Sequence, residues 1–405
     1  MKKAWFMSIL VFLAAITCSL AFMKAPPTMV LIMQAFDAGL AVIGLVMTIP
    51  TVMTIAMPLP FGAVVEKIGP KRAMLVTLGC ALIGNSLGAI STSFSMLLFA
   101  RVFDGAAFSG AMICLPKVIA MWFPPQKRGL PMGVLFAMFV PMGLLIAAKI
   151  ASPIAASFTW RGIWWFCAIL NIIAIILMLF FKEPSEGEGA VKVASSVDPV
   201  KKTSLLSSYK SPLVWGVGIA FFLKTMLSSS FTNFYSTYLV KSAGYDLATA
   251  NRTYSYAIIG MIIGGVFAGA ILNKVNKKYH AILLIASFVL MAIPVFYEYH
   301  LTGPLTLLVP FCLFSGFIYT IPLPIVFTIA PNVANRPEDI GPIMGIVNFG
   351  NGIGGLISSL IIGPLVIVIG GWSGLSTPLL AILALPLIVS LILQKAYAKK
   401  IKTVD

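Results

Sequence analysis

Charged residues are scarce in this sequence. Asp, Glu, Lys and Arg together make up 10% of its 405 residues, whereas 60% of the residues are hydrophobic. A soluble domain carries about 25% charged residues, so this chain has too few charges to cover a surface that faces water. The scarcity excludes a soluble globular protein and indicates an integral membrane protein.

Residues that enzymes and metal sites use are also few or wrongly spaced. The chain has two histidines and five cysteines, and no cysteine pair has the spacing of a metal site. Neither a Ser-His-Asp pattern nor a phosphate-binding G-x-x-x-x-G-K-[ST] segment occurs. The sequence therefore predicts no enzymatic activity, no metal, no cofactor and no ATP-driven step within this chain.

Acidic residues are the rarest charged group. Twelve acids stand against 28 lysines and arginines, which gives a net charge of +16. With both termini placed in the cytoplasm, 20 of the 28 basic residues fall in cytoplasmic segments, which is the positive-inside pattern of membrane proteins. Topology and contact with membrane lipids thus explain the excess charge, which does not indicate a nucleic-acid partner. We expect a multi-pass monomer in the plasma membrane.

Long apolar runs dominate what is present. Runs of roughly 20 residues, the length that crosses a hydrocarbon core, occur twelve times, and their continuity favours helices over barrel strands. The first run is too long for the apolar region of a signal peptide, so we expect it to be retained. The sequence predicts an all-α membrane protein with twelve transmembrane helices near residues 5–34, 39–63, 73–93, 95–121, 130–152, 160–181, 212–240, 249–272, 280–299, 304–330, 340–369 and 373–394.

A polar stretch divides these runs into six and six. Residues 182–211 are rich in Ser, Gly, Glu and Lys, and they predict a flexible cytoplasmic linker between bundles at 1–181 and 212–405. The segment GAVVEKIGPK at 62–71 has a counterpart, GAILNKVNKK, at 269–278, and each closes the second helix of its half. The halves therefore resemble each other as parallel repeats, which predicts two pseudo-symmetric six-helix bundles.

The loop after the second run resembles the signature loop of the major facilitator superfamily, whose frame is G-x-x-x-[DE]-x-x-G-x-[RK]. An arginine followed by glycines in the fourth run, RVFDGAAFSG, is a further similarity. The resemblance implies that two bundles alternate access to a central site and that this loop latches one state. The alternative is a plain positive-inside loop. The latch residues are Gly62, Glu66, Gly69, Lys71 and Arg72, with the degenerate second copy at Gly269, Asn273 and Lys278.

The residue types of the loop suggest how a latch would work. Its glycines let helix ends and a tight turn approach a neighbouring helix closely. Glu66 can accept hydrogen bonds from the N-terminus of a neighbouring helix, and the basic residues can pair with acids or lipid headgroups.

Lys224 lies at membrane depth, where an ionisable side chain costs roughly 2.5–3.5 kcal/mol. It is about 18 Å into the seventh run, in a polar stretch that also holds Asn233 and Tyr235. We expect this stretch to line a water-filled cavity that binds the solute, together with Tyr319. The alternative is a lysine held by helix-end carbonyls or by an acid.

Lys24 is a second basic residue at depth. Pro26 and Pro27 follow it and should break the first helix, because proline has no N–H to donate. We expect Lys24 to face the cavity at this break. The stretch is similar to the cyanate-transporter branch of the superfamily, and MWFPPQKRG after the fourth run is similar to its anion-transporting branches, the nitrate type included.

Arg101 and Asp104 are three residues apart, on the same face of the fourth helix. Two interpretations stay open: a neutralised ion pair, or an Arg101 that faces the cavity and is tuned by Asp104 as the coupling residue. Asp104 is the only acid placed clearly at depth, and Asp37 and Glu298 are placed near outer helix ends. Because the buried charge is chiefly basic, an anionic solute is favoured.

The leading hypothesis is a secondary active transporter, working by symport or antiport, for a small anionic solute. One alternative is an exporter of drug-like compounds by proton antiport, since FVPMG at 139–143 weakly resembles an antiporter motif. The other is a membrane receptor that does not transport.

Overall fold

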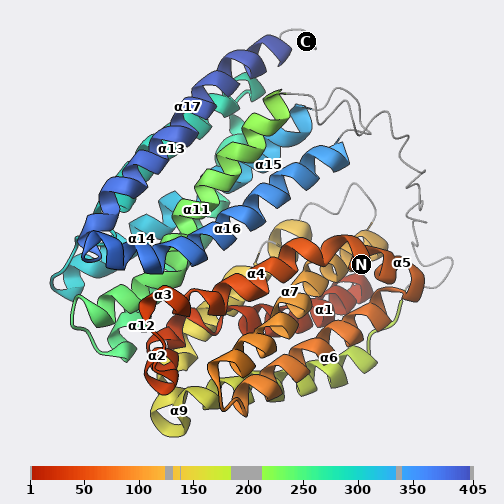
Figure 1. Ribbon diagram of the computed structural model, residues 1–405. Coiled ribbons are helices and arrows are strands. Elements are labelled where there is room, and N and C mark those ends of the chain that lie inside the picture. The colour runs from red at the N-terminus through yellow and green to blue at the C-terminus, as the bar shows by residue number, and fades with distance from the viewer. Residues whose placement is uncertain (1, 124–130, 137, 184–211, 334–339, 402–405) are drawn as a thin grey trace. The chain divides into compact units, whose positions relative to one another are not determined.

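The computed structural model describes residues 2–123, 131–136, 138–183, 212–333 and 340–401, and every regular element in these residues is helical. From residue 184 onward the predicted linker falls outside the described residues. In chain order the elements of Figure 1 and the short turns between them are α1 (Lys2–Met23), η1 (Pro26–Thr28), α2 (Met29–Phe36), α3 (Leu40–Ile43), α4 (Leu45–Ala56), α5 (Pro58–Ile68), α6 (Pro70–Ala89), α7 (Phe94–Trp122), η3 (Met132–Phe136), α9 (Phe139–Leu179), α11 (Pro212–Lys241), α12 (Leu247–Lys274), η4 (Lys277–Tyr279), α13 (His280–Tyr297), α14 (Leu305–Thr320), α15 (Pro322–Asn332), α16 (Ile340–Ile369), η6 (Ser373–Leu375) and α17 (Ser376–Ile401).

The predicted apolar runs all correspond to helical structure. Ten segments of the described chain are long and apolar enough to cross a membrane. One of them, Val134–Leu179, accounts for two predicted runs, because α9 joins two helices at Phe158 and Thr159, where the backbone leaves helical geometry. The second run is built from the shorter helices α3, α4 and α5. The prediction of an all-α membrane fold is confirmed.

The chain separates into two compact units. Unit 1 comprises the described residues of 1–39 and 45–197, and unit 2 comprises those of 40–44 and 198–405. The short helix α3 belongs to unit 2 because it packs against α16.

Unit 1 is built around α1, α6, α7 and α9. Helix α1 packs against α7 and α9, α6 packs between α7 and α9, and α4 packs on α7. Ser19 of α1 donates a hydrogen bond to the carbonyl of Val140 in the first half of α9 (3.3 Å). Gly88 of α6 lies against the ring of Trp164 in the second half. The first span thus meets the fifth, the second meets the fourth, and the third meets the sixth.

Unit 2 repeats this order of packing. Helix α11 packs against α16, α12 against α14, and α13 against α17, so the first, second and third spans again meet the fifth, fourth and sixth. Gly350 and Gly354 of α16 allow close approach to α11, since an added Cβ would lie 2.6 Å from the Gly218 carbonyl oxygen or 3.1 Å from Thr225 Cβ.

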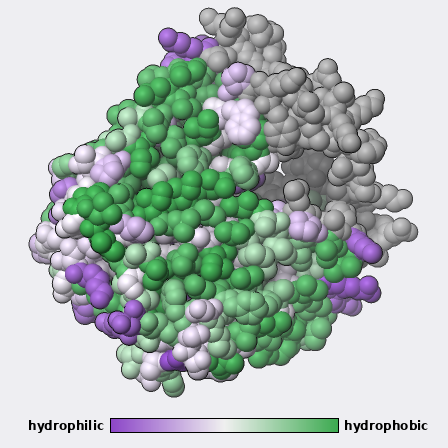
Figure 2. Space-filling view, in the orientation of Figure 1, coloured by the Kyte–Doolittle hydropathy of each residue, from purple (hydrophilic) through white to green (hydrophobic). Residues whose placement is uncertain are grey.

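Large apolar side chains cover much of the exterior. In the second half of α9, Ile169, Ile172, Ile173 and Ile176 form one helical stripe, and each exposes between 46% and 55% of its side chain. Figure 2 shows broad hydrophobic areas on the face in view. Leaving apolar surface in water forgoes roughly 25 cal/mol of burial free energy for every Å², so this exterior is suited to contact with lipid.

Candidate functional site

The first helix breaks where its prolines predict. Helix α1 ends at Met23, a 3-10 turn covers Pro26–Thr28, and α2 begins at Met29. In an unbroken helix the carbonyl of Phe22 would accept from residue 26, but Pro26 has no N–H. Pro50 likewise leaves the carbonyl of Val46 in α4 without its helical donor. These carbonyls are buried and need other donors.

Arg101 of α7 supplies those donors. Its guanidinium donates to the carbonyl oxygens of Phe22 (2.7 Å), Ala21 (2.9 Å) and Val46 (2.9 Å), and also to Asp104 Oδ2 (2.6 Å). The five N–H donors of a planar guanidinium are spread over three nitrogens and can serve four separated acceptors, whereas the three donors of a lysine come from one nitrogen. Arg101 is fully buried, so it ties the broken end of α1 to α4 and α7.

Lys24 joins the same carboxylate. Its Nζ lies 2.9 Å from Asp104 Oδ2 and also donates to Asn85 Oδ1 of α6. The ammonium group lies 4.7 Å from the ring centre of Trp164, a distance suited to a cation–π contact. We name Lys24, Asn85, Arg101 and Asp104 the Asp104 cluster. All four side chains are fully buried.

The Asp104 cluster keeps an excess of positive charge. Two cations share one carboxylate, so the formal charge of the cluster is two minus one, or +1. Both cations meet at Oδ2, while Oδ1 of Asp104 has no hydrogen-bond partner among the described residues. The ion pair of Arg101 with Asp104 is present as one interpretation predicted, and Lys24 is a third member that the sequence did not reveal.

Lys224 of α11 contrasts with Lys24. It is the thirteenth residue of a 30-residue helix, and only 9% of it is exposed. Its Nζ lies 5.9 Å from the ring centre of Phe221, and within the described part of the chain it forms no hydrogen bond and no ion pair. A buried cation without a counter-ion is energetically costly, so Lys224 is a candidate for pairing with an anion from outside the protein.

The polar neighbours of Lys224 mostly have internal partners. Thr225 donates to Asn351 Oδ1 (2.9 Å), and Asn233 donates to Ser359 Oγ (3.0 Å), both on α16. Of the other residues predicted to bind the solute, Tyr235 is fully buried beside Cys312. The polar stretch of α11 thus partly serves to bond α11 to α16.

Glu298 is a second buried acid. It was placed near an outer helix end, and it does follow the last residue of α13, but its side chain is fully buried. Tyr319 of α14, a residue predicted to bind the solute, donates to Glu298 Oε2 (2.5 Å), while Oε1 has no partner in the described chain. Glu298 therefore joins Asp104 as a fully buried acid, although it lies at a helix end as predicted.

The predicted latch loop contacts the end of α9. Gly69 precedes α6 with φ of +82° and ψ of 158°, a conformation that is essentially restricted to glycine. An added Cβ there would lie 2.9 Å from Glu183 Oε1. The backbone N–H of Lys71 donates to Glu183 Oε1 (3.2 Å), and Lys71 Nζ donates to the carbonyl of Leu179 (3.0 Å). Glu183, which the sequence analysis did not single out, accepts at the N-terminus of α6.

The other predicted latch residues have different surroundings, and few of them make a close contact. An added Cβ at Gly62 or Gly269 would meet no described atom within 4 Å, so the close approach expected at these two glycines is not found. Arg72 is exposed, and Lys278 Nζ lies 4.9 Å from the ring centre of Tyr279. The side chains of Glu66 and Asn273 lie outside those that the structure describes.

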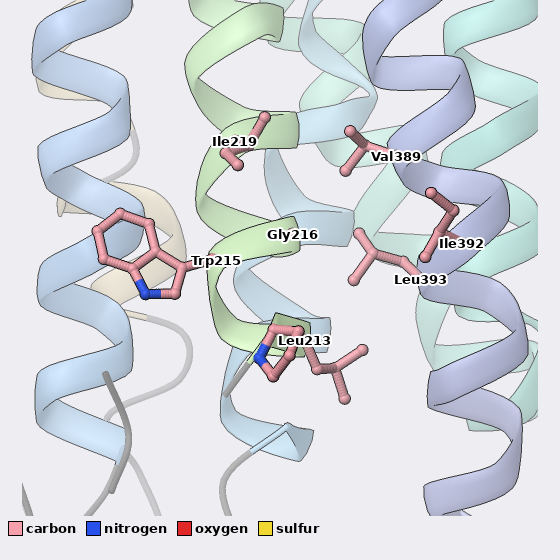
Figure 3. A pocket seen from close by; sticks show the side chains of 8 residues that line it. Leu213, Trp215, Gly216, Ile219, Val389, Ile392 and Leu393 are labelled. Atoms are coloured by element: carbon pink, nitrogen blue, oxygen red, sulfur yellow. The ribbon is translucent and has the colours of Figure 1, made fainter. Parts of the chain in front are cut away.

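A separate cavity of about 300 Å³ lies between α11 and α17. Ile219 of α11 lines it, and in Figure 3 Val389 and Leu393 of α17 point toward α11. No charged side chain lines it, and it is therefore unsuited to a charged solute.

The sequence is similar to those of known membrane transporters. Residues 8–359 match the sequence profile of the Major Facilitator Superfamily. The chain belongs to this superfamily. Among curated members, it is 24% identical over 371 residues to a probable nitrate transporter of Staphylococcus epidermidis (89% of each chain), and 23% identical over 328 residues to a nitrite extrusion protein of Bacillus subtilis (79% of this chain and 77% of that one).

A hexuronate transporter of Bacillus subtilis is 24% identical over 224 residues, which are 54% of this chain and 53% of the transporter. The chain thus matches about half of the length of that relative. Two solved structures share the fold at 14% identity and a TM-score of 0.74. They are a bacterial homologue of the lysosomal transporter Spinster (98% of this chain, 97% of that one) and the nucleoside transporter NupG (97% and 99%).

Proposed function

We propose that this superfamily member is a secondary active transporter, and not an enzyme, that moves a small anionic solute across the plasma membrane by alternating access. The helical membrane fold and the superfamily support transport. Three relatives are named for nitrate, nitrite and hexuronate, all of which are small anions. The positive-inside pattern supports cytoplasmic termini.

Lys224 is the observation that carries the proposal. It is a buried cation near the middle of α11 without a counter-ion in the described chain. Charge-assisted hydrogen bonds are about twice as strong as neutral ones. Because Lys224 has no acid of the described chain as a partner, an incoming anion could form such a bond with it without displacing an internal counter-ion.

The remaining predicted roles are part of the same proposal. Lys24 and Arg101 are buried and bonded to Asp104, Asn85 and carbonyls, so we expect either to bind a solute only after one of these contacts opens. The coupling role of Asp104 requires the same opening. The loop around Gly69 would act as a latch if its contact with Glu183 breaks and reforms during transport.

Flux into liposomes tests the proposal. The purified protein is reconstituted, and uptake of labelled nitrate, nitrite and glucuronate is compared with uptake of a quaternary ammonium dye and of a neutral hexose. We expect saturable uptake of at least one anion and of neither other probe. Uptake of the cation alone would instead indicate the drug-exporter function, and binding of an anion without any flux would indicate a receptor.

Two lysine variants of the same helix sharpen this test. Lys224→Ala should weaken the apparent affinity for the transported anion by roughly 10- to 1,000-fold, which corresponds to a few kcal/mol. Lys241→Ala, which removes an exposed charge from the last residue of α11, should leave the affinity within a few fold. Equal affinities in the wild type and Lys224→Ala would refute the site.

A further inference from the structure

Glu298 is a buried acid that the proposed transport site does not use. It follows α13, and three helices bring side chains to it or its immediate neighbours: α11, α13 and α14. Its carboxyl receives one hydrogen bond, from the hydroxyl of Tyr319 (2.5 Å), and its second oxygen has no partner among the described residues. No described lysine, arginine or histidine forms an ion pair with it.

The titratable groups around Glu298 are phenols. Tyr319 of α14 donates to its carboxyl and Tyr299 follows it in the chain, while Tyr235 of α11 packs on Phe231, whose ring also lies against Tyr319. Tyr299 is itself tied to α11, because its hydroxyl bonds to the Ser230 hydroxyl (2.9 Å). None of these groups carries a positive charge.

Other elements near Glu298 supply no described counter-ion: α12, which packs on α14, carries Arg252 near its start, and that residue is exposed. Helix α15, which packs on α13, contains no charged residue, and the first charged residue of α17 is Lys395, far along that helix. His300 is exposed and bonds to Ser376 Oγ (2.8 Å) and to the carbonyl of Phe296 (2.9 Å).

Burial without a counter-ion decides the charge state of a carboxyl. A buried ion is costly unless it is paired and fully hydrogen-bonded, and groups in such positions become neutral instead. One phenol donor does not satisfy a carboxylate, which has about four acceptor positions. Asp104 is the internal contrast, since it is equally buried but has two cations within 2.9 Å. The two buried acids are therefore built for different charges.

We propose that Glu298 and Tyr319 form a proton-binding site: Glu298 holds a proton in the present conformation and releases it when a conformational change hydrates the carboxyl. Tyr319 donates to the carbonyl-type oxygen of the protonated acid and to the carboxylate after release. Intramembrane carboxyl groups that change protonation are a means by which transporters use a proton gradient. As a coupling device, this site rests on the proposed transport function; as a proton site, it does not.

Infrared difference spectroscopy tests proton binding without any solute. Spectra of the purified full-length protein are recorded between acidic and basic pH for the wild type, Glu298→Gln and Tyr319→Phe. We expect a carboxylic-acid band that disappears as the pH rises in the wild type, is missing in Glu298→Gln and is shifted in Tyr319→Phe.

The variants include their own controls. Glutamine preserves the size and the acceptor oxygen of Glu298, so this variant should fold. Asp246→Asn, at an exposed acid, should leave the band unchanged. A Glu298→Gln spectrum identical to that of the wild type would overturn the proposal.

Nitrate flux in liposomes tests the coupling. With one proton carried per anion, a gradient of about one pH unit supports roughly tenfold accumulation. We expect this accumulation in the wild type, and in Glu298→Gln we expect nitrate exchange at equal pH but no accumulation. Equal accumulation in both proteins would overturn the coupling role. If the infrared band is assigned to Glu298 but no anion of the panel is transported, the proton site stands and the proposed anion function fails.

Discussion

The guanidinium of Arg101 lies 2.7 Å from the carbonyl oxygen of Phe22, whose helical donor would have been the nitrogen of Pro26. The same side chain lies 2.9 Å from the carbonyl of Val46, whose helical donor would have been that of Pro50. Arg101 thus replaces the hydrogen bonds that two prolines remove, one at the break after α1 and one inside the continuous helix α4.

Arg101→Lys should therefore be destabilising although it keeps the charge. A lysine cannot reach three carbonyls and a carboxylate together, and each buried acceptor left without a donor costs about 1–3 kcal/mol. We expect the free energy of unfolding to fall by about 2–5 kcal/mol, measured by denaturant unfolding in detergent. Pro50→Ala returns an N–H to the carbonyl of Val46, so it should restore part of the stability of Arg101→Lys. Wild-type stability in Arg101→Lys would contradict this role.

The Asp104 cluster gives a second prediction, based on charge balance. Asp104→Asn raises the formal charge of the cluster from +1 to +2, and breaking a buried ion pair costs about 3–5 kcal/mol. Adding Lys24→Met returns the charge to +1, so the double variant should unfold at a higher temperature than Asp104→Asn alone. Additive losses in this double-mutant cycle would show that the two side chains do not interact.

The sequence predicted the local features of the site because they depend on local rules. Pro26 and Pro27 break a helix wherever they occur, and the spaced apolar runs can only be membrane helices. Gly69 was singled out by its frame, and its positive φ explains why a glycine is needed there.

Contacts between distant residues were not predictable in the same way. Lys24 meets Asn85 and Asp104 across 61 and 80 residues of sequence, and such contacts depend on how helices pack. Glu298 was placed near an outer helix end, and it does end α13, but its burial depends on side chains of other helices, such as Tyr319 of α14, which its own stretch of sequence does not reveal. One signal was available: a carbonyl four residues before an intrahelical proline needs another donor, which could have pointed to Arg101.

The loop before α6 should be sensitive to small changes. Gly69→Ala forces a Cβ into a conformation that costs about 1–3 kcal/mol for other residues, and the Cβ would also lie 2.9 Å from Glu183. We expect slower transport and lower stability. Glu183→Ala in the Gly69→Ala background removes the steric contact but not the backbone strain, so rescue should be partial. Full rescue would show that the backbone conformation is not limiting.

The start of α12 has a pH-dependent cap. Hydrogen bonds from the side chain and backbone N–H of Thr249 lower the pKa of Asp246 below its usual value. A lowered folded-state pKa adds stability above the unfolded pKa of about 4, and this stability is lost as the pH falls through the folded-state value. Asp246→Ala should cost about 0.5–1 kcal/mol near neutral pH, at the low end for caps because the site is exposed.

The stability lost in Asp246→Ala should depend on pH, and this dependence can be measured. The difference in unfolding temperature between the wild type and Asp246→Ala should shrink below about pH 4. Asp246→Asn, which caps without a charge, should differ from Asp246→Ala by an amount that does not change with pH. A constant difference between the wild type and Asp246→Ala at every pH would rule out the carboxylate as the cap.

The same substitution at two buried lysines should change stability in opposite directions. Lys24→Met removes donors from Asn85 and Asp104, so it should lower the free energy of unfolding by about 1–3 kcal/mol. Lys224→Met removes a buried charge without a described counter-ion, and replacing such a charge by an apolar group is neutral or stabilising.

Lys224→Met should therefore unfold at or above the wild-type temperature while it loses anion binding. Lys224→Arg, which keeps the charge but changes its reach, should retain part of the binding. Thermal unfolding with and without nitrate measures both effects, because a bound ligand raises the unfolding temperature. A Lys224→Met protein that is strongly destabilised would show that Lys224 has an internal partner and serves the fold, and its assignment to the solute would be wrong.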